Sequence, residues 1–485
     1  MGQRLREAER VLCLGEHPFD GVDAVSLLEH LAEAVRVDPS GGRLWLLFTA
    51  VAGAFPTDVQ HEALRRRFEF AVHGEALKIV LECTEAAAAK AGEWSRPLRI
   101  VESAIVVDVN FCAKFAHNTG IQRVVRSLMP HLMTLADGNL QLVAWTKRNG
   151  LTRSLTALER ARVLDWPGVS TGAAVAPSDE PDELVVPWNS SYFIPEVPEK
   201  ELCDRLAALA EFSGNRVSLI GYDTIPIGSA DLVSAAESER FARYLTIVKH
   251  VDEVIAISES VAEEFRGFTT ALGAQGLVGP TIHSIPLAAD VPDEPAKPDE
   301  DAVKPLVISV GSHEPRKNQD AVLFAVETLL GEGLDFRFVF VGGGSRDRTL
   351  PFDRKLRALR AERGWDIQSV RGMSDAKLWA LYGQARFSVF ASLHEGYGLP
   401  VVESLASGTP VLTANYGSLA EIAAGGGCLT IDPRDDDAII AGIRTLLTDE
   451  TALAKLQREA AKRHPRNWSN YAADVWKNSA LAVKP

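Results

Sequence analysis

Six short apolar runs, each followed by a helical pattern, fill much of the second half of this 485-residue chain. Runs of this length are typical of strands that are buried on both faces of a sheet. Strands that alternate with crossover helices form a mostly parallel sheet with helices on both faces. The sequence therefore predicts a doubly wound α/β domain over residues 303–465. The predicted strands are Leu306–Val310, Phe338–Val341, Ile367–Val370, Phe387–Ala391, Val411–Thr413 and Cys428–Ile431.

A looser alternation of the same kind covers residues 98–290 and predicts a second Rossmann-like domain. Residues Thr146–Asp182 are less regular and contain several prolines and glycines, which indicates either a long mobile loop or a variable acceptor-side insertion. The predicted strands are Ile105–Val109, Leu142–Trp145, Leu184–Val186, Val217–Ile220, Val254–Ile257 and Ile282–Ile285.

Three further segments complete the predicted organisation. Residues 1–97 have helical periodicity and no recognisable chemistry, so they form an accessory module that could pair subunits, dock a partner or touch a membrane. Residues 291–302 are proline-rich and acidic, as expected of a solvated linker between domains. Residues 466–485 contain a last helical pattern.

Composition narrows the class of protein. The net charge is −14 and there is no long basic block, which argues against nucleic acid as a partner. The chain start lacks a signal-peptide core, and the apolar stretch Leu44–Phe55 is about half of a membrane span. We therefore expect a cytoplasmic protein, with peripheral contact at the inner membrane face left open. The five scattered cysteines are expected to be buried free thiols.

The stretch Phe387–Pro410 carries the clearest chemistry. A buried strand leads through a glycine-bearing turn to a helix, in which Pro400 suits the first turn. Glu395 on the loop and Glu403 on the helix have seven residues between them, so both can face a ligand that lies across the helix start. Free backbone N–H groups at a helix N-terminus favour a phosphate.

This stretch resembles retaining glycosyltransferase family 4, whose E-x7-E motif Glu395 and Glu403 match. The resemblance is good over Leu306–Trp476 and looser over Ile105–Ile285. It implies a GT-B fold, in which two Rossmann-like domains face a cleft and the last helix crosses back to the first domain. It also implies that a nucleotide diphosphate sugar is the donor and a saccharide or glycolipid hydroxyl is the acceptor.

The resemblance assigns roles within the second domain. Glu403 is expected to hold the ribose hydroxyls, and Glu395 is expected to be catalytic, close to the reacting carbon of the donor sugar. The sugar and the diphosphate would also meet the backbone of Gly396, Tyr397, Gly398 and Leu399. The base would lie against Val370, Arg371 and Met373.

Gly311–Asn318 resembles the family's G-x-x-E-P-R-K-N motif at the end of a predicted strand. Arg316 and Lys317 there can bind a diphosphate, one with a planar fork and the other as a point charge. No metal or other cofactor is expected, because these cations can stabilise the leaving diphosphate. Asp435–Asp437 contains a D-x-D sequence, but its position before a helical pattern indicates an N-cap with first-turn acids.

On the first domain, residues 117–123 resemble the T-G-I-Q-R pattern of mannosyl- and rhamnosyltransferases of surface polysaccharides. Gly120 would let the backbone approach the donor phosphates, while Arg123 would either face the acceptor or be solvated. Asp223 lies in a segment that resembles H-D-x-I-P and is the other catalytic candidate, and Tyr222 stands where relatives often carry histidine. The acceptor-side candidates are Asn118, Thr119, Arg123 and Tyr222.

The resemblance thus implies a retaining, metal-independent hexosyltransferase, with GDP-mannose as the first choice of donor and UDP- and dTDP-sugars open. Two other functions stay in view. A nucleotide-sugar hydrolase or epimerase of the same fold would act without an acceptor. A non-catalytic assembly module would use residues 1–97, where oligomerisation is also open.

Overall fold

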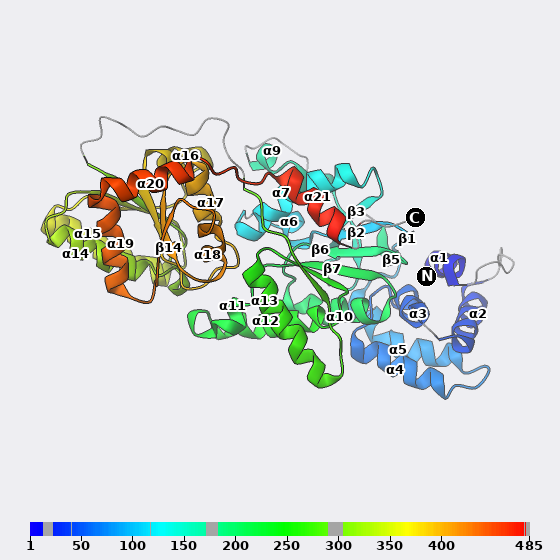
Figure 1. The fold of residues 1–485 in the computed structure, drawn as a ribbon. Helices are drawn as coiled ribbons and strands as arrows, with labels where there is room; N and C mark the ends of the chain where they lie inside the picture. The colour runs from blue at the N-terminus through cyan, green and yellow to red at the C-terminus, as the bar shows by residue number, and fades with distance from the viewer. Residues whose placement is uncertain are drawn as a thin grey trace.

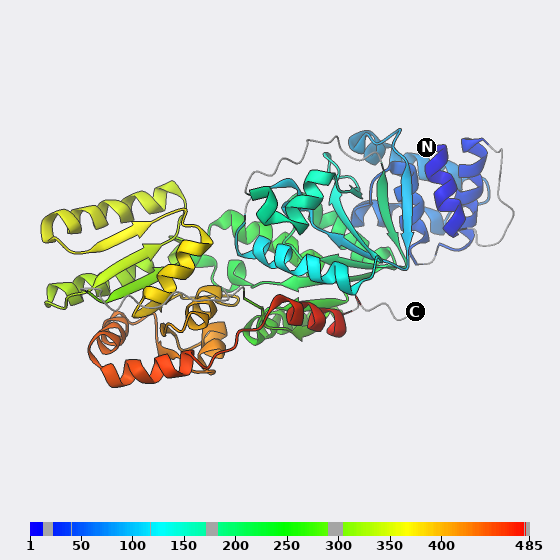
Figure 2. The same ribbon diagram turned by 90° about the horizontal axis from the view of Figure 1, so that it is seen from above.

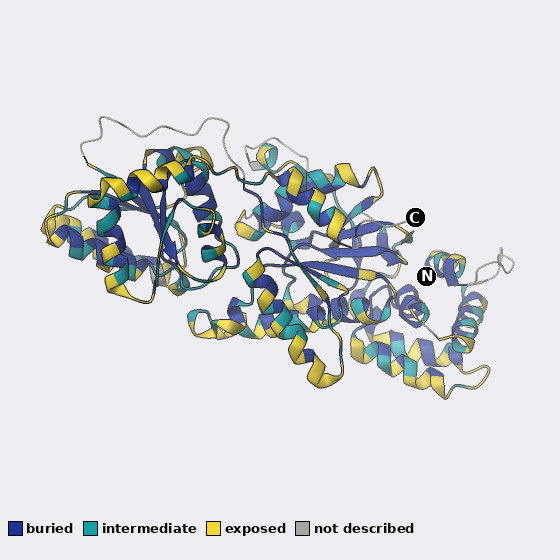
Figure 3. Ribbon diagram, viewed as in Figure 1, coloured by how far each residue is buried: buried dark blue, intermediate teal, exposed yellow. Residues whose placement is uncertain are grey.

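The structure is a computed structural model that describes residues 1–12, 23–39, 41–116, 118–170, 183–289, 304–479 and 481. A helical module, a domain built on a nine-stranded sheet and a domain built on a six-stranded sheet follow one another along the molecule (Figure 1 and Figure 2). In both sheets the strands are mostly buried and the covering helices turn exposed faces outward (Figure 3). The predicted linker 291–302 lies outside the described residues.

The helical module shares its core with the first domain. Phe55 stacks on Trp45 within the module and lies edge-on to Trp145 of the nine-stranded sheet, with ring centroids 4.9 and 5.6 Å apart. Leu44–Phe55, the long apolar stretch of the sequence, is therefore a buried structural segment. Among the described helices, none has the length and hydropathy needed to cross a membrane. The helices of the module are α1 (Gly2–Leu12), α2 (Ala24–Val37), α3 (Arg43–Ala52), α4 (Asp58–Glu69) and α5 (Ala76–Ala91).

The first domain has strand order β1-β5-β4-β3-β2-β6-β7-β8-β9, and only β4 runs antiparallel to its neighbours. Its elements are β1 (Leu98–Glu102), β2 (Ile105–Asp108), α6 (Asn110–Lys114), α7 (Gly120–Leu135), β3 (Leu140–Trp145), β4 (Thr152–Ser154), α8 (Ala157–Leu164), α9 (Trp166–Ser170), β5 (Leu184–Trp188), β6 (Ser191–Ile194), η1 (Lys200–Leu202), α10 (Cys203–Phe212), β7 (Arg216–Gly221), α11 (Ile225–Gly228), η2 (Ala230–Leu232), α12 (Ala235–Val248), β8 (Glu253–Ala256), α13 (Glu259–Leu272), η3 (Gly273–Gln275) and β9 (Thr281–Ser284).

The interpretation of Thr146–Asp182 as a mobile loop is wrong for the part that the structure describes. Strand β4 is inserted between β3 and β5, and helix α8 follows it. A buried ion pair between Arg153 and Glu159, with two N–O distances of 2.8 Å, fastens the helix to the strand. Residues 171–182 lie outside the described part of the chain.

The second domain has strand order β12-β11-β10-β13-β14-β15, with every pair parallel. All six predicted strands are confirmed within one residue at each end. Helix α21 crosses back and packs against α7 of the first domain. The elements are β10 (Leu306–Val310), η4 (Pro315–Lys317), α14 (Gln319–Gly331), β11 (Arg337–Val341), α15 (Arg346–Arg363), β12 (Ile367–Val370), α16 (Asp375–Gln384), β13 (Phe387–Phe390), α17 (Leu399–Ala406), β14 (Val411–Ala414), α18 (Gly417–Ala423), β15 (Cys428–Ile431), α19 (Asp436–Thr448), α20 (Glu450–Ala460) and α21 (Trp468–Asn478).

Candidate active site

The order of the strands places the two motifs of the second domain side by side. Strands β10 and β13 are neighbours although β11 and β12 lie between them in the sequence, so the strand order reverses here. Ligands of open α/β sheets bind at such a switch point, outside the carboxyl ends of the strands. The turn with Arg316 and Lys317 follows β10, and the loop with Glu395 follows β13.

A partly buried ion triad occupies this point. Arg316 Nη1 lies 3.0 Å from Glu395 Oε2, and Lys317 Nζ lies 2.5 Å from Glu395 Oε1. The side chains of Glu395 and Lys317 are only 9% and 11% exposed. Ser392 donates a further hydrogen bond of 2.5 Å to the same Glu395 oxygen.

Burial and the neighbouring charges shift the pKa values of Lys317 and Glu395 in opposite directions. Burial lowers the pKa of Lys317, against the opposing effect of Glu395. Burial would raise the pKa of Glu395, but the Lys317 and Arg316 cations outweigh it and hold that pKa below its usual value. The site therefore keeps an ionised carboxylate between two cations in a place with little water, where charge interactions are strong.

Glu403 joins the two domains. Its Oε1 lies 3.0 Å from Nη1 of Arg123 on α7, and its Oε2 accepts a hydrogen bond of 3.3 Å from the Tyr382 hydroxyl. Burial raises the pKa of Glu403, and the Arg123 cation opposes this rise. The sequence analysis expected Arg123 either to face the acceptor or to be solvated. The structure pairs it instead with Glu403.

The loop between the two glutamates contacts the first domain directly. Ser258 donates a hydrogen bond of 2.7 Å to the carbonyl of Gly396. A Cβ atom at Gly396 would lie 2.0 Å from the carbonyl oxygen of Tyr222, so this approach requires glycine. Beside it, Asp223 accepts a hydrogen bond from the backbone of Ile225, and burial raises its pKa while Arg316 lowers it.

His394 completes the contact between the domains. Its ring nitrogens lie 2.8 Å from Glu264 Oε1 and 2.8 Å from Ser229 Oγ. The hydrogen bond to Glu264 raises the pKa of His394. Glu264, Ser229 and Ser258 carry no motif, and the sequence analysis missed all three because they meet the loop only through the fold.

The remaining residues of the predicted loop differ in where they point. Gly398 has φ 116° and precedes α17, and a Cβ there would lie 2.6 Å from Leu419. Leu399 and Pro400 then begin the helix, as predicted. The Tyr397 side chain reaches the backbone carbonyl of Leu287 at 2.8 Å, in a wall of a different cavity.

The predicted base-binding turn follows β12, two strands away from the triad in the sheet. Val370 ends this strand, and Met373 packs against the small hydrophobic cluster that contains Tyr382. The guanidinium of Arg371 pairs with the carboxylate of Asp353. The turn is thus at the same edge of the sheet as the triad, but its arginine is already paired.

The first-domain candidates surround the start of α7. Gly120 is the first residue of α7, and the space around its Cβ position is open to 4 Å. Thr119 precedes it and forms a capping box with Gln122. The Asn118 amide oxygen accepts a hydrogen bond of 2.9 Å from Arg126.

The side chain of Tyr222 does not point toward the predicted acceptor side. Its ring is buried, and its hydroxyl donates a hydrogen bond of 2.7 Å to the carbonyl of Pro195. Only its backbone carbonyl faces the second domain, at Gly396. The substitution of tyrosine for the family's histidine therefore fills the core of the first domain and leaves no ring in the cleft.

Asp435 caps helix α19, as the sequence predicted. Its side chain accepts hydrogen bonds of 3.0 and 3.3 Å from the backbone N–H groups of Asp437 and Ala438. Across the described residues, no group of three or more His, Cys, Asp and Glu side chains is placed to hold a metal ion.

The sequence analysis also missed a buried carboxylate that follows β6. Glu196 accepts hydrogen bonds of 2.7 and 2.8 Å from the backbone N–H groups of Phe111 and Cys112. It lines a cavity of about 470 Å³ together with residues of the first turn of α7. Burial raises the pKa of Glu196 to about 7.

This raised pKa predicts a pH dependence of stability. Between about pH 4.5 and 7 the folded chain holds a proton on Glu196 that the unfolded chain has lost, so the free energy of unfolding should fall as the pH rises through this window. The total contribution is on the order of 1–3 kcal/mol. In Glu196→Gln, whose amide does not titrate, urea unfolding should give a flatter pH profile. Exposed Glu201→Gln is the matched control, and identical slopes in the three proteins would contradict the prediction.

Comparisons with known proteins show which proteins this chain resembles. Residues 290–464 match the family model "Glycosyl transferases group 1". The serotype-specific mannosyltransferase WbdA of Escherichia coli is 27% identical over 335 residues, which cover 66% of this chain and 40% of that protein. The O-antigen chain mannosyltransferase B of Escherichia coli is 35% identical over 142 residues, which cover 29% of this chain and 36% of that protein. This chain thus spans about two fifths of the length of these relatives.

A solved structure supports the same fold. The crystal structure of Anabaena HepE in complex with UDP and glucose superposes with a TM-score of 0.53 and 12% sequence identity, and covers 78% of this chain and 99% of that one. The predicted architecture, two Rossmann-like domains that face each other, is confirmed. Residues 290–464 therefore resemble the glycosyl transferases of group 1, and the chain has the GT-B glycosyltransferase fold and resembles mannosyltransferases.

Proposed function

We propose that this protein is a cytoplasmic, retaining glycosyltransferase that moves a hexose from a nucleotide diphosphate sugar to a hydroxyl of a saccharide or glycolipid. The observation that carries the proposal is the partly buried triad of Glu395, Arg316 and Lys317 at the switch point of the second sheet. GDP-mannose is the proposed donor. The T-G-I-Q-R resemblance and the two relatives named as mannosyltransferases support this choice.

The triad fits a donor in which charge develops on the leaving diphosphate. Arg316 and Lys317 would bind the two phosphates, and their charges would stabilise the diphosphate as the bond to the sugar breaks. Protein cations make this stabilisation independent of a metal ion. Glu395, released from part of its ion pairing, would accept hydrogen bonds from the sugar hydroxyls.

Retention follows from the family resemblance and needs no protein nucleophile. The incoming hydroxyl would attack from the face that the diphosphate leaves, and a leaving phosphate oxygen would take the proton. Glu395 accepts hydrogen bonds from three donors, which suits an orienting acceptor better than a nucleophile. Glu403 would accept from the ribose, so its pairing with Arg123 must be shared or exchanged when the nucleotide binds.

The proposal is tested by incubation of the protein with GDP-mannose, UDP-glucose or dTDP-rhamnose. Each donor is supplied with and without a mannoside acceptor, and each reaction is repeated in the presence of EDTA. We expect an α-mannoside product from GDP-mannose only when the acceptor is present. NMR should show that the product keeps the anomeric configuration of the donor, and EDTA should not lower the rate of transfer. Free mannose or an epimerised donor without acceptor would favour a hydrolase or an epimerase. No turnover of any donor, in spite of binding, would favour the assembly module.

Removal of either cation should weaken binding of the diphosphate. Arg316→Ala and Lys317→Ala each remove a charged donor from a site with little water, and charge-assisted contacts contribute on the order of 1.5–3 kcal/mol. Calorimetric titration with GDP should therefore show about a tenfold or larger loss of affinity in each variant. Arg444→Ala removes an exposed cation of the same domain and should change nothing. Wild-type affinity in both site variants would reject the assignment.

A further inference from the structure

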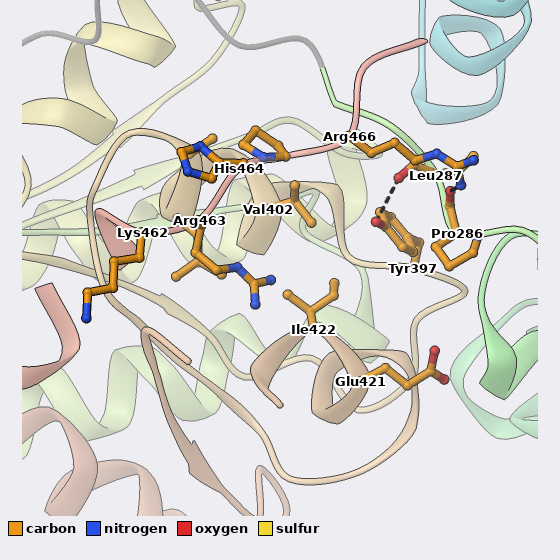
Figure 4. Close-up of a pocket in the computed structure, with 13 residues that line it drawn as sticks. Pro286, Leu287, Tyr397, Val402, Glu421, Ile422, Lys462, Arg463, His464 and Arg466 are labelled. Atoms are coloured by element: carbon orange, nitrogen blue, oxygen red, sulfur yellow. Dashed lines mark hydrogen bonds between the residues drawn. The ribbon is translucent and has the colours of Figure 1, made fainter. Parts of the chain in front are cut away.

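A second cavity, of about 380 Å³, lies where the chain passes twice between the two domains (Figure 4). One wall is the segment after β9, with Pro286 and Leu287, and another is the run Lys462–Arg466 that leads to α21. Its floor is apolar and is formed by helices α17 and α18. The floor residues are Val402, Leu405, Ala406 and Ile422.

The run Lys462–Arg466 makes the cavity strongly positive. Lys462 and Arg463 line it, and neither side chain makes an ion pair with any residue that the structure describes. Arg466 is paired with Asp474. The one carboxylate among the lining residues belongs to Glu421, whose oxygens accept hydrogen bonds from the backbone N–H groups at the start of α13.

The guanidinium of Arg463 lies against the backbone of Gly425. A Cβ atom at Gly425 would lie 1.4 Å from Arg463 Nη1, so the guanidinium rests directly on the glycine backbone. Figure 4 shows Tyr397 on the opposite wall, with its hydrogen bond to Leu287. Burial raises the pKa of Tyr397 to about 12, against the lowering effect of Arg466 and Arg463. The two cations and the tyrosine thus share one enclosure.

We infer that this cavity binds an organic phosphate with an apolar part, and that the ligand acts as an effector of domain closure. A guanidinium fork beside an ammonium group suits a phosphate, and the aliphatic floor suits an apolar substituent. A volume of this size is in the range of small-molecule sites. The inference goes beyond the proposed function, because it concerns a site other than that of the donor.

The effector role follows from what the cavity touches. Its two walls are joined by a hydrogen bond of 3.1 Å from Ala289 N to the Arg466 carbonyl, and by one of 2.9 Å from Arg466 to the Pro286 carbonyl. Tyr397 belongs to the same loop as Glu395. A ligand that contacts both walls and this loop interacts differently with open and closed arrangements, and such a difference is what shifts a conformational equilibrium.

Hexyl phosphate is a suitable probe, with inorganic phosphate and hexanol as partial probes that lack the chain or the charge. Calorimetry should show that hexyl phosphate binds more tightly than either. Lys462→Ala/Arg463→Ala should weaken this binding about tenfold or more, since two charge-assisted contacts are lost. Gly425→Ala should weaken it as well, because the new methyl group displaces Arg463. Arg458→Ala, which removes an exposed cation of α20, should bind as wild type.

Two results would overturn the inference. The first is unchanged affinity in the double variant, and the second is displacement of hexyl phosphate by GDP, which would place the probe at Arg316 and Lys317. X-ray scattering should show a change in the radius of gyration on addition of hexyl phosphate in the wild type and none in the double variant. Binding without this change would reject the effector role. Co-sedimentation with phosphatidate vesicles would identify a lipid headgroup as the source of the phosphate. Binding of hexyl phosphate without co-sedimentation would identify a soluble metabolite as the source, and either result supports the site.

Discussion

In Glu395→Gln, glycosyl transfer should fall by about 100-fold or more, while binding of GDP should not weaken. Glutamine keeps the size of the side chain but removes the charge that faces Arg316 and Lys317. Loss of a preorganised electrostatic contact at the reacting centre costs about 10²–10³ in rate. The diphosphate, by contrast, gains two cations that no longer have to be shared with a carboxylate. Transfer rates with GDP-mannose and calorimetry with GDP measure the two effects separately.

Glu314→Gln is the matched control. Glu314 pairs with the same Arg316 at 2.8 Å, but its side chain is 43% exposed. Its hydrogen bond with Lys317 is made by the backbone carbonyl, which the substitution leaves in place. An exposed ion pair contributes little, so this variant should transfer at close to the wild-type rate. If Glu395→Gln and Glu314→Gln lost activity equally, the rate would depend on the orientation of Arg316 and not on the buried carboxylate. Weaker GDP binding in Glu395→Gln would show that the glutamate holds the cations in place for the ligand.

The sequence predicted the second domain well because its strands are buried on both faces. Each of the six strands is therefore a run of apolar residues that stands out from the helices around it, and all six were located within one residue. The same clarity made the candidate site residues easy to place along the sequence, since Arg316, Lys317 and Glu395 each follow such a run. Strand order then brings them together, and the order itself could be expected from the resemblance to the family.

Strands β1, β4 and β6 of the first domain were not among the predicted strands, and the reasons differ from strand to strand. Strand β4 consists of Thr152, Arg153 and Ser154, with no apolar side chain, and it is held by neighbours that lie far from it in the sequence. Strand β6 begins only three residues after β5 ends, yet it pairs with β2 and β7 on the other side of the sheet. Local pattern indicates a strand but cannot indicate its neighbours.

Contacts between the domains were not predictable from the motifs. Arg123 and Glu403 each belong to a recognisable pattern, but nothing in either pattern indicates that they form an ion pair. The same is true of Ser258 and Gly396, which are 138 residues apart. Such contacts depend on how two finished domains dock, and pairwise chemistry of this kind is visible only in three dimensions.

The closeness of this docking predicts a large effect of one methyl group. In Gly396→Ala, the new Cβ atom would lie 2.0 Å from the carbonyl oxygen of Tyr222, and a backbone atom in a strand-to-helix connection cannot move away easily. The domains should therefore separate, with loss of the hydrogen bond from Ser258. A shift of about 1 Å between reacting groups can cost 10²-fold in rate, so we expect transfer to fall by about 100-fold. X-ray scattering should show a larger radius of gyration.

Gly331→Ala separates this effect from a general response to a lost glycine. Gly331 ends helix α14, and a Cβ atom there would meet no other atom within 4 Å. Alanine is favoured over glycine in a helix by about 1 kcal/mol, so this variant should keep its activity and be at least as stable as the wild type. Both variants should show wild-type circular dichroism, because neither methyl group enters the core of a domain. Wild-type transfer by Gly396→Ala would mean that catalysis takes place in an arrangement of the domains more open than this one.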